Sequence, residues 1–465
     1  MPMDNTVKPF GIKDKLGYLF GDLANDFTFI FSSSFLMKFY TDIMGVSAGV
    51  VGAVMMVARI VDAFTDVAMG RLCDRSKTTA HGKFKPWLRR MCGPVAISSF
   101  LMYQGSLASL PYGVKVAYLF VTYILWGSVF YTSVNIPYGS MASSISPEPG
   151  DRQSLSTFRT LGGMLAGGIV TAGVPLIAFK KDASLGIDVI DSTSFTITAG
   201  VFSLLAVICY LLCFSLTTER VRTNPTADAT ASGNVFVMLK NAAKNRALIS
   251  IICASIVMLL AQLTMQQMAN YVYPITYGNA KMISLSTVLM TVGMAVAAIF
   301  AKPLSSKIGK AEVSVLSNLF AGITTLILFF VRPQSVYVYI ALQSLSWIGL
   351  GIFAMVNWAL ITDVIDYSEI RNGIREDGSV YALYSFARKL GQAASSGVSG
   401  ALLTLIGYDA ENVTDAVKDG IFNISTLVPA VGLILLAAIL WFWYPLHKKQ
   451  VDENVRILKE KHEGN

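Results

Sequence analysis

The sequence predicts an all-α membrane protein with twelve transmembrane helices in two pseudo-symmetric halves of six. Of the 465 residues, 54% are hydrophobic and only 14% are charged, whereas about a quarter of an ordinary soluble protein is charged. Apolar runs longer than the roughly 20 residues that cross a bilayer recur along the whole chain. One long polar stretch near the middle separates these runs into two equal groups.

The apolar runs define the predicted helices. Several exceed the length that a perpendicular helix needs, so tilt or overhang is expected. We expect spans at 16–39, 46–73, 88–109, 115–143, 156–179, 194–217, 246–273, 282–303, 311–332, 335–362, 380–407 and 418–444.

The polar stretch has the composition of a linker, with proline, threonine, alanine, serine and glycine between residues 225 and 233. A weak internal repeat supports two related halves, because a basic, glycine-containing loop follows the second span of each, at 70–90 and 302–310. The predicted parts are an N-terminal half (1–217), a linker (218–245), a C-terminal half (246–445) and a tail (446–465).

Basic residues orient the chain, because lysine and arginine mark the cytoplasmic side of a membrane protein. They gather before the first span, in the even-numbered loops, in the linker and in the tail, and they are scarce in the first and third loops. We therefore expect both termini in the cytoplasm and a multi-pass location in the inner membrane. The net charge of +8 belongs to this pattern and predicts no nucleic-acid partner.

The sequence lacks the motifs that would predict an enzyme. There is no HExxH, P-loop or GxSxG motif, and the three histidines (His81, His447 and His462) lie outside the spans. The five cysteines lie in or beside apolar runs without metal-ligand spacing, so we interpret them as small core residues. No cofactor and no metal centre is expected. A sensor built on a transporter-like fold remains an alternative.

The second span carries ionisable residues at helical spacing. Asp62 and Asp66 are four residues apart and share a helix face, and Arg59 lies three residues before Asp62. A buried charge costs at least about 2.5–3.5 kcal/mol, so such a cluster indicates function. The alternative is an internal ion pair between Arg59 and Asp62 that only joins helices.

Other spans carry polar and aromatic residues of the kinds that bind a sugar. Hydroxyls need donors and acceptors, and the apolar face of a sugar ring packs on aromatic rings. Polar side chains in spans also serve as interhelical contacts, and Trp358 could be an interfacial anchor. The candidates are Asn25, Asp26, Tyr131, Asn135, Arg159, Trp358, Tyr384 and Lys389.

At these residues the chain resembles the glycoside–pentoside–hexuronide:cation symporter family, the melibiose permease group of the major facilitators. The resemblance runs from residue 14 to about 445, and the loop GKFKPW (82–87) and the two-aspartate helix are its most specific parts. The other matching stretches are 21–27, 39–42, 58–66, 135–140, 363–367 and 386–392.

The resemblance implies roles for individual residues. Asp62 and Asp66 match the residues that hold the coupling cation. Asp26 and Arg159 match residues that hold sugar hydroxyls, while Tyr131, Asn135 and Lys389 fall on site positions. The chain departs from the melibiose permease pattern at Thr65, Asn135 and Gly139, where that pattern has asparagine, aspartate and tryptophan. The sequence of 135–140 resembles the glucuronide and pentoside branch.

The implied function is import of a glycoside by symport with a cation through alternating access of two rocking halves. We expect H+ rather than Na+, with Asp62, Asp66 and Thr65 at the site, because burial and a nearby like charge raise the pKa of a carboxyl. Na+ at Asp62 and Asp66 stays an alternative, as does a lysolipid carrier. We expect Lys83 and Lys85 to help close the cytoplasmic side against acidic residues that include Asp363 and Asp366. The expected partners are the sugar, the cation and the bilayer, with the monomer as the functional form.

Overall fold

The computed structural model describes residues 9–182, 186–221, 245–372 and 377–463. The chain divides into two compact units. Unit 1 comprises Met1–Ala231 with Tyr408–Val413, and unit 2 comprises Ser232–Gly407 with Thr414–Asn465. Most of the predicted linker, residues 222–244, lies outside the described residues, so its limits stay predictions.

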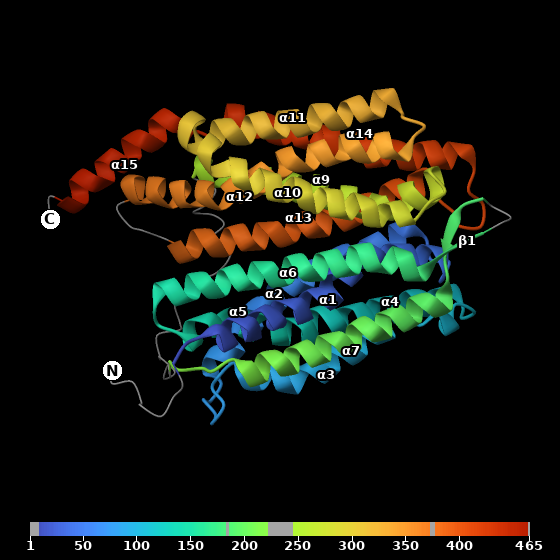
Figure 1. The fold of residues 1–465 in the computed structure, drawn as a ribbon, viewed down its shortest axis with the longest axis horizontal. Helices are drawn as coiled ribbons and strands as arrows, with labels where there is room; N and C mark the ends of the chain where they lie inside the picture. Colours follow the sequence, from blue (N-terminus) through green and yellow to red (C-terminus); the bar gives the residue numbers. More distant parts are fainter. Residues whose placement is uncertain (1–8, 183–185, 222–244, 373–376, 464–465) are drawn as a thin grey trace. The chain divides into compact units, whose positions relative to one another are not determined.

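Unit 1 is a bundle in which α1 packs along α6 and α7, and α3 lies beside α7 (Figure 1). A π-helical stretch, η2, joins α4 to α5, so that these three form one continuous span. The elements are α1 (Ile12–Asp42), α2 (Ala48–Arg75), α3 (Lys85–Leu101), η1 (Gly105–Leu107), α4 (Tyr112–Ile124), η2 (Leu125–Tyr131), α5 (Thr132–Ile145), α6 (Pro149–Ala178), β1 (Phe179–Lys181), β2 (Asp188–Ile190) and α7 (Ser192–Leu216).

Unit 2 is a second helical bundle, in which α11 packs on α12 and α14, and α9 packs on α13 and α14. Two π-helical stretches, η3 and η4, extend α9 and α14. The elements are α9 (Arg246–Tyr271), η3 (Val272–Thr276), α10 (Lys281–Ile308), α11 (Lys310–Val331), α12 (Val336–Asn372), α13 (Asp377–Leu405), α14 (Asp415–Ala438), η4 (Ile439–Trp443) and α15 (Lys448–Glu463).

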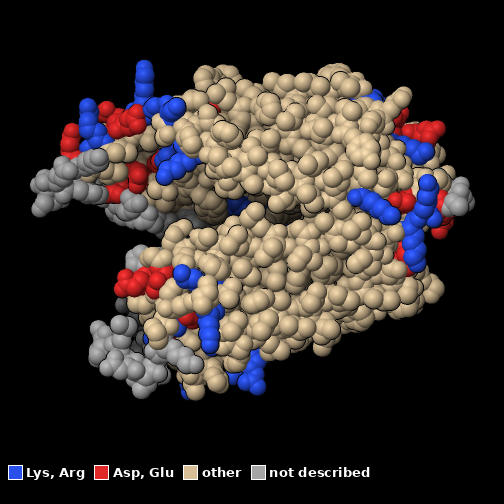
Figure 2. Space-filling view, in the orientation of Figure 1, with Lys and Arg blue, Asp and Glu red and all other residues tan. Residues whose placement is uncertain are grey.

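The helices have the length and surface of membrane spans. Nine of them, in the part of the chain that is described, are long and apolar enough to cross a bilayer. The other predicted spans are present as α1, which carries Asp22, Asp26 and Lys38, as α3, which has 17 residues, and as α13. Charged side chains gather at the helix ends, whereas the middle of the visible face is almost free of them (Figure 2). An apolar surface of this extent is typical of contact with lipid.

The weak internal repeat is visible in the backbone. Gly82 (φ 108°) precedes α3 and Gly309 (φ 119°) precedes α11, and both adopt a conformation that favours glycine. A carboxylate lies against each, from Glu219 at Gly82 and from Glu312 at Gly309, at distances that leave no room for a Cβ atom. The loop between the second and third helices of each unit therefore contains a glycine with positive φ beside a carboxylate.

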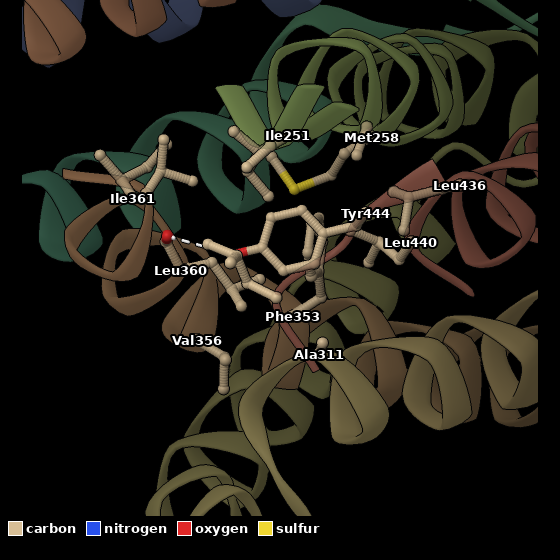
Figure 3. Close-up of a cluster of buried hydrophobic side chains, with 14 of the residues drawn as sticks. Ile251, Met258, Ala311, Phe353, Val356, Leu360, Ile361, Leu436, Leu440 and Tyr444 are labelled. Carbon is tan, nitrogen blue, oxygen red and sulfur yellow. Dashed lines mark hydrogen bonds between the residues drawn. The ribbon is translucent and has the colours of Figure 1, made fainter. Parts of the chain in front are cut away.

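The core of unit 2 is apolar and closes around Tyr444, whose ring lies among Ile251, Met258, Phe353 and Leu440 (Figure 3). The Tyr444 hydroxyl donates a hydrogen bond to the carbonyl oxygen of Leu360 at 3.4 Å. This bond gives the only polar atom of that ring a partner inside an otherwise apolar cluster.

Three features were not predicted from the sequence. Strands β1 and β2 form an antiparallel hairpin between α6 and α7, and Lys180 of β1 pairs with Asp191 at 2.9 Å. The predicted tail contains the helix α15. The segment Tyr408–Val413 belongs to unit 1, where the Tyr408 hydroxyl donates to Asp42 Oδ1 at 2.8 Å and accepts from Lys38 Nζ at 3.0 Å.

Candidate functional site

The predicted ionisable cluster of α2 is assembled around an ion pair. The Arg59 guanidinium lies 3.1 Å from Asp62 Oδ2, and both side chains are buried, with 7% and 6% of their surface exposed. The alternative considered from the sequence, an Arg59–Asp62 pair, therefore exists. It lies within a single helix, so the pair by itself does not join two helices.

Aromatic rings surround the guanidinium of Arg59. Its central carbon lies 4.7 Å from the centroid of the Phe29 ring of α1 and 5.8 Å and 5.9 Å from those of Tyr123 and Trp126. A cation over aromatic faces gains electrostatic stabilisation when it is shielded from water. These rings and Asp62 together explain how an arginine is held inside a membrane helix.

Two hydroxyl groups from the span formed by α4, η2 and α5 face the two aspartates of α2. Ser128 donates to Asp62 Oδ1 at 2.5 Å, and Thr132 donates to Asp66 Oδ1 at 2.9 Å. Both pairs are 66 residues apart in sequence, so two i, i+4 ladders lie in register. Ser128 belongs to the π-helix η2, a form that is frequent at functional sites.

The third predicted cation residue, Thr65, is placed differently. Its hydroxyl donates to the backbone carbonyl of Asp62 at 3.3 Å, in its own helix. Asp66 is half-buried, whereas Asp62 is 4% exposed. The carboxylate of Asp62 thus already accepts from Arg59 and Ser128, and Asp66 is the more accessible of the two acidic groups.

A second polar cluster lies between α1 and α6. Arg159 Nε of α6 donates to Asp22 Oδ1 of α1 at 3.0 Å, and the guanidinium lies over the Tyr138 ring at 5.4 Å. Tyr138 stacks on Tyr18 at 4.5 Å, and these two tyrosines exchange hydrogen bonds between their hydroxyls and backbone carbonyls. Arg159 is therefore held from two sides, by a carboxylate and by a ring.

Glycines of α6 allow this close approach. A Cβ atom at Gly162 would lie 2.5 Å from the backbone oxygen of Leu19, so that glycine brings the α1 and α6 backbones together. A Cβ atom at Gly163 would lie 2.8 Å from Asp26 Oδ2 and 3.0 Å from Asp22 Oδ2. The carboxylates of Asp22 and Asp26 therefore both lie over Gly163.

The remaining sugar candidates of unit 1 lie in two settings. Asn25 is buried in the contact between α1 and α7, where its Oδ1 accepts from the Tyr210 hydroxyl at 2.8 Å. Tyr131 and Asn135 are half-buried on η2 and α5. The Tyr131 ring stacks on Phe29 at 5.7 Å, and the same Phe29 ring lies under Arg59. Phe29 thus connects the sugar candidates with the ionisable cluster of α2.

The candidates in unit 2 form a cluster of their own. Trp358 and Tyr384 meet edge to face at 5.1 Å, and the Arg388 guanidinium lies 5.6 Å from the Trp358 ring. Tyr384 is fully buried and accepts a hydrogen bond from the Asn357 amide, while Trp358 is 42% exposed and Lys389 is half-buried. The buried Tyr384, which Asn357 contacts, therefore supports the exposed ring of Trp358.

The predicted gating residues have partners inside their own units. Lys83 Nζ donates to the Asp74 carbonyl at 2.9 Å, and Lys85 Nζ donates to the Thr217 carbonyl. Asp363 pairs with Lys310 at 2.5 Å. The carboxylate of Glu219 accepts from the backbone N–H groups of 83, 84 and 85 at the start of α3. The gating role stays a prediction, and the structure adds Glu219 as the residue that shapes this loop.

Four residues of these clusters were not predicted as site residues, namely Ser128, Thr132, Asp22 and Tyr138. A signal for the first two was present, because Ser128 and Thr132 have the same i, i+4 spacing as Asp62 and Asp66. Asp22 has the same spacing to Asp26. No comparable sequence signal pointed to the tyrosine beneath Arg159.

Comparison with known proteins identifies the family to which the chain belongs. A family model described as MFS/sugar transport protein matches residues 17–448. The chain belongs to this family. The glucuronide carrier protein homolog of Escherichia coli (strain K12) is 32% identical over 445 residues, covering 95% of this chain and 94% of that protein. The isoprimeverose transporter of Lactiplantibacillus pentosus is 29% identical, covering 92% of this chain and 88% of that protein.

A solved structure shows the same fold. The crystal structure of a D-xylose-proton symporter matches with a TM-score of 0.67 at 16% identity, covering 93% of this chain and 98% of that chain. The predicted fold class and the predicted family resemblance are confirmed. As a member of the MFS sugar transport family, the chain is a multi-pass membrane transporter of sugars, and its family and relatives are transporters rather than enzymes.

Proposed function

We propose that the protein imports a glycoside, such as a pentoside, a glucuronide or a related oligosaccharide, by symport with H+. The observation that carries the cation coupling is the pair of hydroxyl–carboxylate contacts, Ser128 with Asp62 and Thr132 with Asp66. They place two acidic groups of α2 against the span that also carries the sugar candidates Tyr131 and Asn135. Occupancy of the acidic groups can therefore affect the sugar site through a direct contact.

The assignment of H+ follows from charge balance. Arg59 supplies a positive charge at 3.1 Å from Asp62, so a metal cation on that carboxylate would be repelled by the guanidinium. A proton needs only one carboxylate, and Asp66 is the more accessible one. We therefore assign proton binding to Asp66, with Asp62 and Arg59 as a fixed pair that holds the helix face in register.

Coupling requires that the cation and the sugar favour the same state, and the gain in affinity is reciprocal. The contact chain from Arg59 over Phe29 to Tyr131 offers a physical route for it in unit 1. Asp26 and Arg159 bind hydroxyls in this proposal, because charged groups form the stronger hydrogen bonds. In unit 2, the residues that bind the sugar in this proposal are Trp358 and Lys389. The monomer is the functional form, and both termini lie in the cytoplasm.

The test is uptake of labelled sugar into proteoliposomes under an imposed pH gradient or an imposed sodium gradient. We expect accumulation with the pH gradient and alkalinisation outside when sugar is added. The variant compared with the wild type is Asp66→Asn, which should exchange sugar in counterflow without accumulating it. Accumulation driven by sodium alone would overturn the proton assignment, and absence of both accumulation and counterflow would overturn sugar transport.

A further inference from the structure

We propose that the polar surface formed by Asp22, Asp26 and Arg159 selects glycosides without a negative charge, and that Asp26 makes this selection. The inference rests on the proposed function and narrows it, because the similar proteins named for a glucuronide and for isoprimeverose differ in whether the named sugar carries a charge. It assigns this transporter to neutral, hydroxyl-rich sugars rather than to uronides or sulfonated sugars.

The carboxylates of this cluster outnumber its guanidinium groups. Arg159 is engaged by Asp22, with 3.0 Å between Nε and Oδ1, so its charge is compensated inside the cluster. The carboxylate of Asp26 lies on the same glycine, Gly163, as that of Asp22. One guanidinium thus faces two carboxylates, and the second carboxylate has no equal positive charge within this cluster.

Three other cations of unit 1 lie on α1 or contact its residues. Arg59 is paired with Asp62 and enclosed by rings. Lys38 is paired with Asp42 at 2.6 Å at the other end of α1, and Arg220 with Asp14 at 2.8 Å at its beginning. Each of these cations therefore compensates a carboxylate of its own and does not offset Asp26.

The side chains of the cluster differ in how far they are exposed. The side chain of Arg159 is 43% exposed, whereas that of Asp22 is 12% exposed. Asp26 is half-buried. Of the two carboxylates over Gly163, Asp26 is therefore the one more open to a ligand that binds the exposed guanidinium of Arg159. The small neighbour Gly139, whose Cβ would lie 3.9 Å from Arg159 Nη1, leaves that side open.

Sugar chemistry then decides which ligand fits. A hydroxyl donates to Asp26 and accepts from Arg159, so a pair of adjacent hydroxyls uses both groups through charge-assisted hydrogen bonds. A carboxylate or sulfonate can only accept, and next to Asp26 it meets a like charge. At a separation of a few ångströms the repulsion weakens binding on the order of tenfold to a hundredfold at a partly solvated site.

The experiment compares ligands that differ only in the substituent on C5 of the sugar ring, which is CH2OH, H or a carboxylate. Equilibrium binding of p-nitrophenyl β-D-glucoside, β-D-xyloside and β-D-glucuronide is measured by displacement or thermal stabilisation of the purified protein. We expect the wild type to bind a neutral member at least about tenfold more tightly than the glucuronide. Asp26→Asn should reduce that ratio toward one, because the amide removes the repulsive charge, whereas Asp26→Glu should keep it.

Two further variants make the result decisive. Asp26→Ser removes the same charge with a smaller side chain if the asparagine variant does not fold. As a control, Asp191→Asn removes a half-buried charge at the start of α7, outside the cluster. Preference of the wild type for the glucuronide, or an unchanged ratio in Asp26→Asn and Asp26→Ser, would overturn the charge selection while sugar transport stood. Binding of no sugar of either class by a folded wild type would overturn the proposed function and the selection with it.

Discussion

Arg59 and Asp62 form a buried ion pair at 3.1 Å within one turn of α2, beneath the ring of Phe29. The pair changes how the two aspartates of this helix are interpreted. From spacing alone they are equivalent, whereas in the structure Asp62 is bound to Arg59 and Ser128 and Asp66 to Thr132. We assign a structural role to Asp62 and a coupling role to Asp66, and these two roles predict different effects of substitution.

Asp62→Asn should lower the stability of the protein by about 3–5 kcal/mol, because it leaves the buried guanidinium of Arg59 without its counter-charge. Asp66→Asn should change stability by much less, because Asp66 is half-buried and the amide can still accept from Thr132. Thermal unfolding in detergent compares the two variants directly. Equal losses in both would contradict the division of roles.

Asp66→Asn should abolish accumulation of sugar against a gradient, because it removes the carboxylate to which proton binding is assigned. In Asp66→Asn, counterflow of labelled sugar should continue, because exchange at equal concentrations needs no proton movement. The measurement is uptake with and without an imposed pH gradient, with sugar binding recorded separately. Full accumulation in Asp66→Asn would remove Asp66 from the coupling site.

Gly163→Ala should weaken sugar binding strongly and stability little. The added methyl meets only the ends of the Asp22 and Asp26 side chains, which can move aside but then leave their positions around Arg159. Gly162→Ala should instead destabilise the protein, because its methyl meets the rigid backbone oxygen of Leu19. Gly168→Ala, with nothing within 4 Å of the added atom, is the control. A larger loss of stability in Gly163→Ala than in Gly162→Ala, with sugar binding kept in Gly163→Ala, would argue against this placement of the carboxylates.

Replacing Lys83 and Lys85 by glutamine should slow turnover more than it weakens sugar binding. Both side chains hold the loop before α3 through carbonyls of neighbouring segments. Glu219→Gln should act in the same direction, since Glu219 accepts three backbone N–H groups of that loop. Initial uptake rates and equilibrium affinities are measured for each variant. Lost affinity with unchanged turnover would exclude a gating role.

Asp191→Ala should destabilise the start of α7 by about 1 kcal/mol at neutral pH, because Asp191 caps that helix. Hydrogen bonds from Ser194 and then from Lys180 lower the pKa of the Asp191 carboxyl to about 2, from an ordinary value of 3.8. The carboxylate therefore contributes its full stabilisation above about pH 4 and loses it as the pH falls toward 2. Unfolding midpoints of wild type and variant should converge between pH 4 and pH 2, and a constant difference would exclude this titration.

The sequence alone determined the membrane class, the order of the spans and the positions of the intramembrane charges. Length and hydropathy of a run decide whether it crosses a bilayer, and the 3.6-residue period places Asp62 and Asp66 on one face, so both are local properties. The family resemblance added the expected roles of Asp26 and Arg159, and the family itself is confirmed.

Only the tertiary structure decided which groups meet. Ser128 reaches Asp62 across 66 residues, Arg159 reaches Asp22 across 137, and Tyr408 reaches Asp42 across 366. These contacts depend on how closely helices approach and how they are rotated, which Gly162, Gly163 and the π-helix η2 control through backbone geometry. Helix periodicity specifies the face on which a residue lies, but the partner on the opposing face is set by packing, which no local pattern encodes.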